Sequence, residues 1–387
     1  PHCQTKSEAP VELGLDSVRA ATALLTARAF GRFDPETAPL LRDARLRIVD
    51  RVGTLARETG AAAVLVAGDT FDQPLVGDEV LRRLAARLAQ FTDVTWHFLP
   101  GNHDPAVANG VWQRFAKFVD GAHIVIHHEA GLHHITDNVD ILSAPLRARA
   151  IAHDPTAWMD QRDSNPGTIR IGLAHGAVQG FGSAGDASVL IAPDRAVSAR
   201  LDYLALGDWH GVRPVGLRAW YAGTPEPDQF PDNEPGYVLA VRLAGPGEEP
   251  EIERHWLAQY RWQREVLDGD ILAALADLES RILEAGADAS NLLLRLDVNG
   301  RLSLDDEFNL RDRVVRLGDR LLHLEADFSG LKVDAHEFGP ESFGDPLLAA
   351  VAARLAKAAA VGGDDGTIAH EALLVLASLA WSEEAAA

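Results

Sequence analysis

The stretch Gly101-Asn102-His103-Asp104 has the greatest influence on how this sequence is interpreted. It follows directly after the apolar run 94–99 and the turn residue Pro100. A strand that ends here places an amide, an imidazole and a carboxylate at its C-terminal edge, which is where open α/β sheets build their sites. The same tetrapeptide is also compatible with a helix cap. Its significance therefore depends on whether the chain supplies partner residues.

Three further polar segments follow apolar runs that we predict to be buried strands. They are Gly68-Asp69-Thr70-Phe71-Asp72 after 61–67, His175-Gly176 after 168–174, and Gly207-Asp208-Trp209-His210 after 203–206. Any one of these segments alone is typical of a cap or a turn. Four of them, each at the end of a predicted strand, indicate one shared site.

The residue types in these segments suit two-metal phosphoryl chemistry. A single carboxylate such as Asp69 can bridge two metal ions about 4 Å apart. One ion then takes ligands from Asn102, His175 and the region of Asp208, and the other takes His210 and ligands from elsewhere. The sequence therefore predicts a metal centre at these strand ends.

Other metal-capable residues carry less weight. The pairs His127-His128 and His133-His134 have no carboxylate framework, and we predict them to be surface polar residues. The single Cys3 excludes an internal disulfide and a thiolate-cage zinc site. The remaining candidate ligands are His, Asp, Asn and Glu, which suit Mn, Fe, Zn or Mg.

Length and composition set the broad class. A chain of 387 residues is long enough for two domains, and 47% hydrophobic with 24% charged residues is typical of a soluble globular protein. No apolar run approaches the ~20 residues of a membrane span, and no signal-peptide pattern opens the chain, so we expect a cytoplasmic protein without a membrane partner. The net charge of −21 disfavours nucleic-acid binding driven by electrostatics alone. Nucleic acid then requires metals, a local basic groove or a partner to receive its phosphates.

Hydrophobic periodicity predicts alternating helices and strands in the first part of the chain. Helices are expected at 35–58, 78–90 and 109–119, and strands at 61–67, 94–99, 123–126, 139–143, 168–174 and 203–206. Residues 17–30 are only weakly helical. This order favours an α/β fold with a layered sheet sandwich.

A Gly- and Pro-rich stretch at 245–250 is the clearest domain boundary in the sequence. Beyond it we predict helices at 270–285, 304–317, 343–359 and 367–380, with strands at 291–297 and 320–327. The expected domains are an atypical N-terminal segment 1–29, a main domain 30–245 and a smaller C-terminal α/β domain 246–387. The last of these is expected to position substrate or dock a partner.

The four motifs together resemble the signature of the calcineurin-like metallophosphoesterase superfamily. The surrounding sequence resembles the SbcD-like DNA repair exonuclease branch, including the YhaO-like proteins. The supporting stretches are Phe30-Gly31-Arg32-Phe33, Leu173-Ala174-His175-Gly176, Leu206-Gly207-Asp208-Trp209-His210 and Gly223-Thr224-Pro225-Glu226. The resemblance covers residues 30–230 well and the C-terminal region only loosely.

This resemblance implies a layered metallophosphoesterase β-sandwich flanked by helices, with two divalent metals. The metal is commonly manganese, with Fe, Zn or Mg as alternatives. Asp69 would bridge the two ions, Asn102, His175 and Asp208 would bind one of them, and His210 would bind the other.

The resemblance also implies a catalytic role for two further residues. His103, oriented by Asp104, would donate a proton to the leaving oxygen or stabilise the charge that develops on the phosphate. The implied partners are DNA, brought by an SbcC-like ATPase, and a second copy of the chain in a homodimer.

The sequence departs from the family pattern in two places. The family usually has His where this chain has Asp208, and a carboxylate can bind the same metal. The larger departure is the opening motif, a strand followed by Asp-x-His. Counting back without gaps from residue 30 places that pair on Ala23 and Leu25, and a competing register places it on Glu12 and Gly14. The apolar strand before the motif is not recognisable either, and we attribute the loss to a replaced or misread N-terminal segment.

We therefore predict a chain that binds one metal well and is strongly impaired in hydrolysis. The leading interpretation is a phosphodiesterase of the DNA exonuclease or endonuclease type. One alternative is a phosphoesterase that acts on a small substrate, which the acidic charge favours. The other is a non-catalytic subunit that docks on an SbcC-like ATPase and regulates it.

Overall fold

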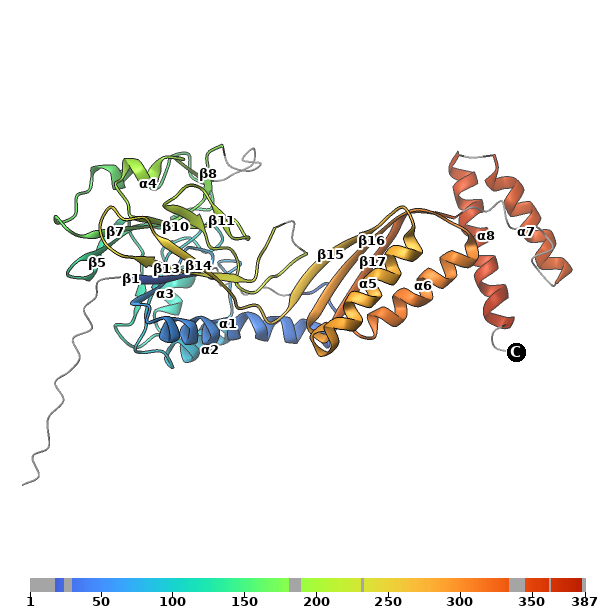
Figure 1. The fold of residues 1–387 in the computed structure, drawn as a ribbon, viewed down its shortest axis with the longest axis horizontal. Helices are drawn as coiled ribbons and strands as arrows, with labels where there is room; N and C mark the ends of the chain where they lie inside the picture. The colour runs from blue at the N-terminus through green and yellow to red at the C-terminus, as the bar shows by residue number, and fades with distance from the viewer. Residues whose placement is uncertain are drawn as a thin grey trace, which may run out of the picture. The chain divides into compact units, whose positions relative to one another are not determined.

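The structure is a computed structural model that describes residues 18–23, 30–180, 189–230, 233–333, 345–361 and 363–384. The chain divides into two compact units, Pro1–Arg261 (unit 1) and Trp262–Ala387 (unit 2). Both units contain helices and sheets, so the fold class is mixed α/β (Figure 1). No helix in the described ranges is long and apolar enough to cross a membrane.

Sheet A of unit 1 has six strands within the described residues, in the order β14-β13-β1-β2-β3-β4. Their bounds are β14 Glu251–Trp256, β13 Tyr237–Leu243, β1 Val18–Ala23, β2 Ala63–Val66, β3 Thr95–Phe98 and β4 Ile124–Ile126. The four strands β1 to β4 run parallel, and β13 pairs antiparallel with β1 and with β14. The C-terminal ends of β2 and β3 therefore lie at the same edge of the sheet.

Sheet B of unit 1 has the order β11-β12-β10-β7-β6-β5 over the described residues. Its strands are β11 Arg213–Pro214, β12 Ala219–Tyr221, β10 Tyr203–Gly207, β7 Ile169–His175, β6 Val139–Ala144 and β5 Gly131–Thr136. The strands β12, β10, β7 and β6 are parallel to one another. A separate short pair joins β8 Ala177–Val178 to β9 Leu190–Ile191.

Helix α1, Thr37–Thr59, shows how the sequence encodes one layer of unit 1. Its buried residues Leu41, Ile48, Val52 and Leu55 recur at three-, four- and seven-residue steps, which places them on one face of a helix. Gly60 ends the helix with φ 65°, a left-handed conformation that glycine adopts without steric cost. Helix α2, Asp78–Leu88, and helix α3, Val111–Phe115, complete the group that packs with sheet A through one buried cluster.

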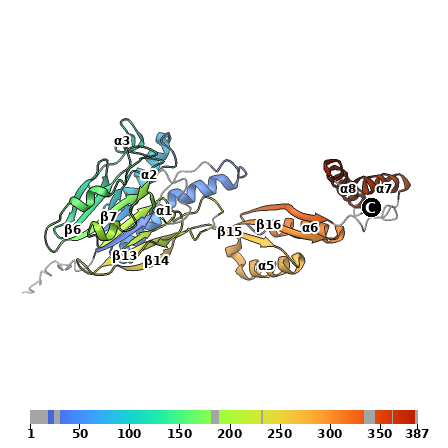
Figure 2. The same ribbon diagram turned by 90° about the horizontal axis from the view of Figure 1, so that it is seen from above.

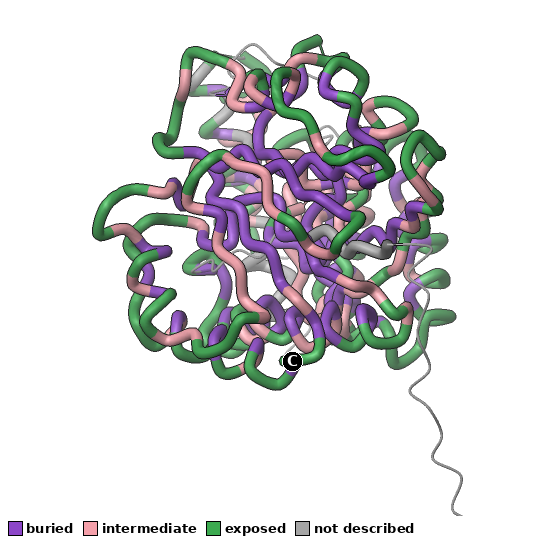
Figure 3. The backbone as a smooth tube through the Cα atoms, turned by 90° about the vertical axis from the view of Figure 1, so that its left-hand side faces the viewer, coloured by how far each residue is buried: buried purple, intermediate pink, exposed green. Residues whose placement is uncertain are grey.

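A second buried cluster joins the two sheets. It contains Leu65 of β2, Leu239 of β13, Ile141 of β6 and Leu173 of β7. A third cluster packs the other face of sheet B against the 3-10 helix η1, Ala157–Gln161, and α4, Arg195–Ser198. Figure 3 shows the buried stretches gathered at the centre of the unit, with exposed loops around them.

Strand β1 corrects the expectation that the N-terminal segment lacks a strand and is weakly helical. Val18–Ala23 lies between β13 and β2, and Ala23 pairs with Val66 at the end of β2. The side chains of Val-Arg-Ala-Ala-Thr-Ala are mostly small, so the run gives little periodic signal, and two neighbouring strands supply its hydrogen bonds instead. Leu25, Glu12 and Gly14 lie outside the described residues.

The boundary between the units also differs from the expected one. Residues 245–250 form the turn of the antiparallel β13–β14 hairpin, in which Arg242 pairs with Glu251. Gly and Pro are equally typical of a hairpin turn and of a linker, because both interrupt regular structure. The division falls after Arg261, close to the start of β15.

Unit 2 contains a three-stranded sheet in the order β15-β16-β17 over the part of the chain that the structure describes. Its elements are β15 Arg261–Leu267, α5 Ile271–Ala285, the 3-10 helix η3 Gly286–Asn291, β16 Leu292–Leu302, α6 Leu304–Gly318, β17 His323–Val333, α7 Pro346–Ala359 and α8 Gly363–Glu384. Leu275 of α5, Leu294 of β16 and Leu310 of α6 share one buried cluster. Helices α5 and α6 lie along this sheet (Figure 2).

Candidate metal centre

Four predicted ligands meet at the imidazole of His175, the last residue of β7. Its Nε2 lies 3.2 Å from Oδ2 of Asp69, 3.3 Å from Oδ1 of Asn102 and 3.7 Å from Oδ1 of Asp208. Its Nδ1 lies 2.8 Å from the carbonyl oxygen of Ala67, to which it donates a hydrogen bond. The ring of a sheet B residue thus bridges to the end of β2 in sheet A. Residues from the ends of four strands are brought together.

Three glycines make this close approach feasible. A Cβ on Gly207 would lie 1.7 Å from the carbonyl oxygen of Ala67, and one on Gly68 would lie 2.1 Å from Nδ1 of His175. A Cβ on Gly101 would lie 2.2 Å from Oδ1 of Asp69. These positions require glycine because any larger residue would push the strand ends apart.

The backbone at two of the carboxylates is strained. Asp69 has φ 50° and Asp208 has φ 105°, both in a region that non-glycine residues rarely adopt. Such conformations persist only where the surroundings enforce them, and they concentrate at functional sites. The strain is consistent with a site in which the placement of these two carboxylates matters.

The electrostatics of the cluster favour an ion pair. Burial would lower the pKa of His175, but the charges of Asp69 and Asp208 outweigh it and raise that pKa to about 9. Burial would likewise raise the pKa of Asp69, yet His175 holds it below its usual value. At neutral pH the cluster therefore contains an imidazolium between carboxylates.

His103 and Asp104 do not interact as expected. The carboxylate of Asp104 is fully buried and accepts backbone N–H bonds from Gly101 at 2.6 Å and Phe71 at 3.0 Å. The ring of His103 instead has its Nδ1 3.0 Å from the carbonyl oxygen of Asp72. Asp104 ties two strand-end loops together, and the orientation of His103 comes from a backbone carbonyl. The expectation that Asp104 orients His103 is therefore wrong.

Burial and the nearby charge of Asp69 raise the pKa of Asp104 well above its usual range, against the opposing effect of its two N–H donors. A carboxyl in this position stabilises the loops that carry Asp69 and Asn102, and it has no surface for substrate. We regard it as a structural support of the site.

His210 lies at the edge of the cluster. Burial lowers its pKa, while the charges of Asp228, Asp69 and Asp208 act in the opposite direction. Its Nδ1 is 3.9 Å from Oδ1 of Asp228, a buried residue that the sequence interpretation missed. The adjacent stretch 223–226 resembles the family, but its sequence does not indicate Asp228.

The resemblance implies a divalent metal at these strand ends. Across the described ranges, no group of three or more His, Cys, Asp or Glu side chains is arranged to hold a metal ion. The chemistry of the donors nevertheless fits one hard or borderline cation, because two carboxylates, an amide oxygen and an imidazole nitrogen converge. The His175 ion pair and a bound cation are alternatives for the same carboxylate oxygens.

A second metal would find fewer ligands. The end of β1 carries Ala23 beside the end of β2, and an alanine methyl group cannot bind a metal. Asp69 and His210 are the only predicted ligands that the described residues place on that side. The donor set thus fits one metal better than two.

Of the two histidine pairs expected at the surface, His134 is exposed, His128 and His133 are partly buried, and His127 is buried, which corrects the expectation for that residue. His127 is buried, its Nε2 lies 3.1 Å from Nδ1 of His97, and its ring contacts that of His133 edge to face. Nε2 of His133 lies 3.1 Å from Oγ of Ser143. This group, which we call the histidine edge, lies where β3 and β4 of sheet A meet β5 and β6 of sheet B.

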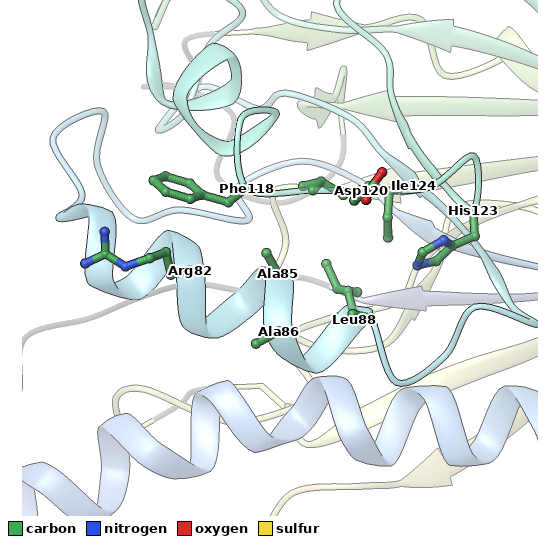
Figure 4. A pocket seen from close by; sticks show the side chains of 10 residues that line it. Arg82, Ala85, Ala86, Leu88, Phe118, Asp120, His123 and Ile124 are labelled. Atoms are coloured by element: carbon green, nitrogen blue, oxygen red, sulfur yellow. The ribbon is translucent and has the colours of Figure 1, made fainter.

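Several surface cavities lie away from the candidate metal centre. One of about 210 Å³ is lined by Arg82, Leu88, Phe118 and His123, on α2 and the segment after α3 (Figure 4). None of the predicted site residues lines it. The candidate centre is defined by converging side chains at strand ends.

A comparison with known protein families matches the same part of the chain. Residues 41–212, less than half of the chain, match the family model described as calcineurin-like phosphoesterase. A crystal structure of TT1561 of Thermus thermophilus is 12% identical, with a TM-score of 0.40, and the match covers 61% of this chain and 98% of that one. A second crystal structure is 10% identical, also with a TM-score of 0.40, and the match covers 62% of this chain and 99% of that one. No curated protein matches the sequence.

Proposed function

We propose that the protein is a metal-dependent phosphoester hydrolase or a derivative of one, because residues 41–212 match the calcineurin-like phosphoesterase family model. One observation carries the proposal. Asp69, Asn102 and Asp208 converge on Nε2 of His175 at strand ends within this domain. Converging hard ligands of this kind are what a phosphoryl-transfer metal requires.

We assign separate roles to the residues of the site. Asp69, Asn102, His175 and Asp208 would hold the cation. The chemistry that such a cation supplies when bound is polarisation of a phosphoryl oxygen and a lowered pKa of water.

His103 stands beside this set on the same loop as Asn102. Its Nδ1 is engaged by the carbonyl oxygen of Asp72, which fixes the ring and leaves Nε2 for the substrate. Through Nε2, His103 would donate a proton to the leaving oxygen or stabilise the charge on the phosphate.

The finer assignment follows the sequence resemblance. We propose a phosphodiesterase of the SbcD-like type, with the layered β-sandwich of that family, manganese as the metal and DNA as substrate. An SbcC-like ATPase would deliver the DNA in the cytoplasm, and unit 2 would dock it. The net charge of −21 supports the need for such a partner, because the acidic surface repels polyphosphates.

The activity of the chain as it stands should be low. Ala23 occupies the strand end where the family has an aspartate, so the metal that would share Asp69 with the first is poorly held. One metal should bind well. The alternative of a non-catalytic subunit is favoured by this same observation.

Hydrolysis assays with manganese test the proposal. Single-stranded DNA, bis(p-nitrophenyl) phosphate and cyclic nucleotides would be compared side by side, together with metal analysis of the protein. We expect one tightly held ion per chain and weak hydrolysis, with DNA or the diester preferred. Two tightly held ions with full activity would contradict the one-metal proposal, and preference for a cyclic nucleotide would favour the small-substrate alternative.

Restoring the family pair separates a damaged enzyme from a binding subunit. The variant Ala23→Asp with Leu25→His adds the two missing ligands. The matched control, Ala23→Asn with Leu25→Gln, adds polar groups of similar size that are poor ligands. Activity recovered only in the first variant supports the enzyme, whereas inactivity in both favours a docking and regulatory role.

A further inference from the structure

The hydroxyl of Tyr221 is bonded to the segment that leaves β7 after His175. Tyr221 lies on β12 and is 2% exposed. Its hydroxyl accepts the backbone N–H of Val178 at 2.9 Å and donates to the carbonyl oxygen of Gly176 at 2.9 Å. We propose that Tyr221 is a positioning residue that fixes the ends of β7 and β10, so that His175 and Asp208 converge on one cation.

The contact spans an intervening strand. In sheet B, β10 lies between β12 and β7. Leu206 of β10 pairs with Tyr221 on one side and with Ala174 of β7 on the other. The backbone hydrogen bonds of a sheet join neighbouring strands only. The Tyr221 hydroxyl therefore adds a tie from β12 to the segment that leaves β7, past the end of β10, which Asp208 follows.

Tyr221 packs on the face of sheet B that is opposite to the candidate centre. Its side chain shares the third buried cluster with Ala174 and Val178, on the side of η1 and α4. Successive side chains of a strand point to opposite faces, so His175 faces away from this cluster. Its imidazole accordingly reaches the carbonyl oxygen of Ala67 in sheet A. Tyr221 thus acts on His175 through the backbone and not by contact with the imidazole.

The two strand ends that carry the ligands are joined at the same place. The backbone N–H of Gly176 donates to the carbonyl oxygen of Gly207 at 3.2 Å. Gly176 directly follows His175, and Gly207 directly precedes Asp208. The peptide groups at Gly176 are thus bonded to β10 through the N–H and to Tyr221 through the carbonyl oxygen. A displacement of this segment would move both ligands relative to each other.

The chemistry of the hydroxyl explains why tyrosine suits this position. A tyrosine hydroxyl accepts one hydrogen bond while it donates another, so it satisfies the N–H of Val178 and the carbonyl oxygen of Gly176 together. Without it, both buried backbone groups lose a partner, and the segment has to shift to regain one. A metal site tolerates only small changes in its ligand distances. The inference rests on the proposed metal-dependent function and adds to it a residue that none of the four strand-end motifs contains.

Metal binding to Tyr221→Phe, which removes only the hydroxyl, provides a test that does not depend on catalysis. Zn²⁺ would be titrated into the full chain in competition with a chromophoric chelator. We expect the variant to bind zinc about tenfold more weakly than wild type, because the effect reaches the ligands through the backbone. The visible absorption of Co²⁺ bound in place of zinc reports ligand geometry and should also change. A hydroxyl with a purely structural role would lower the unfolding temperature of the metal-free protein and leave both measurements unchanged.

The matched control is Tyr203→Phe. Tyr203 is also completely buried in sheet B, but it begins β10 at the end opposite to Asp208. The same atom is removed from the same sheet, and we expect zinc affinity to stay at the wild-type value. An equal loss of affinity in both variants would overturn the positioning role, because it would show a general effect of weakening the sheet.

Thermal unfolding of each metal-free variant shows whether it folds. If Tyr221→Phe does not fold, hydrogen exchange of the Val178 amide in wild type, measured by NMR, takes its place. Coupling between two sites is reciprocal, so zinc must strengthen the hydrogen bond from this amide to Tyr221 if the bond supports the metal site. We expect exchange to be about tenfold slower with zinc bound. An unchanged rate would overturn the inference.

Variants of the ligands separate the inference from the proposed function. Unchanged zinc affinity or an unchanged Co²⁺ spectrum in folded Tyr221→Phe, while His175→Ala weakens binding, would overturn the positioning role alone. Zinc binding that is unaffected by both His175→Ala and Asp208→Ala would overturn the proposed metal centre, and the role of Tyr221 with it.

Discussion

The candidate metal centre around His175 and the histidine edge around His127 both bury an imidazole, but in different surroundings. His175 is completely buried, and its imidazole faces Asp69 and Asp208. His127 is 1% exposed, and its imidazole faces His97 and His133. Both groups lie between the same two sheets of unit 1.

The surroundings reverse the direction of the pKa shift. Burial acts on both groups, but the two carboxylates raise the pKa of His175 to about 9. At the histidine edge nothing opposes burial, and the pKa of His97 falls to about 4 while that of His127 falls well below its usual value. Neighbouring carboxylates, and not burial or the number of histidines, mark a centre that can attract a cation.

We expect the largest effect in the free energy of unfolding when the protein is acidified. The unfolded chain binds a proton at residue 97 below about pH 6.5, whereas the folded chain does not until about pH 4, so stability falls as the pH drops through this window. A shift of this size corresponds to about 3 kcal/mol for His97. His127 adds to the loss in the same direction. Denaturant unfolding of wild type and His97→Gln at pH 7 and pH 4.5 measures the difference.

The variant His97→Gln should lose less stability than wild type on acidification, because it has one fewer buried group that must stay neutral. His153→Gln, at an exposed histidine, is the control and should behave as wild type. Equal acid sensitivity of His97→Gln and wild type would remove the contrast between the two histidine groups.

Removal of one carboxylate should leave His175 in surroundings closer to those of the histidine edge, where no carboxylate of the described residues lies beside the buried rings. Asp69→Asn keeps the size of the side chain but removes its charge, so we expect metal affinity to fall by about 100-fold or more, roughly 2.7 kcal/mol. Calorimetric titration with Mn²⁺ or Zn²⁺ measures the loss. Asp72→Asn on the same loop is the control, because only its backbone carbonyl has a role in the site. Undiminished affinity in Asp69→Asn would show that the carboxylate does not define the centre.

Replacing a glycine by alanine should destabilise the protein more at the candidate metal centre than at the histidine edge, because the strand ends approach more closely there. Gly207→Ala would place a Cβ 1.7 Å from the carbonyl oxygen of Ala67, so we expect it to destabilise the fold by about 1–3 kcal/mol and to weaken metal binding. Gly131→Ala at the histidine edge would place a Cβ 3.4 Å from Nε2 of His133, an ordinary contact, and should be tolerated. Thermal unfolding of both variants makes the comparison. Similar losses in the two would mean that the metal centre is not unusually tightly packed.

Regular elements with a strong periodic signal could be predicted from the sequence. The helix expected at 35–58 is Thr37–Thr59, and the strand expected at 203–206 is Tyr203–Gly207. Strand β1 could not be predicted, because its small side chains carry no pattern and its hydrogen bonds come from residues more than 40 positions away at β2 and more than 200 at β13. The turn at 245–250 was misassigned because Gly and Pro do not distinguish a hairpin from a linker.

The sequence by itself determined which donor atoms are available and that they follow strand ends, because residue type and apolar runs are local properties. Only the tertiary structure decided which atoms meet. Asp104 supports two loops instead of orienting His103, His127 is buried, and Asp228 faces His210. These outcomes depend on contacts between residues far apart in the chain, where burial and neighbouring charge set the chemistry of each side chain.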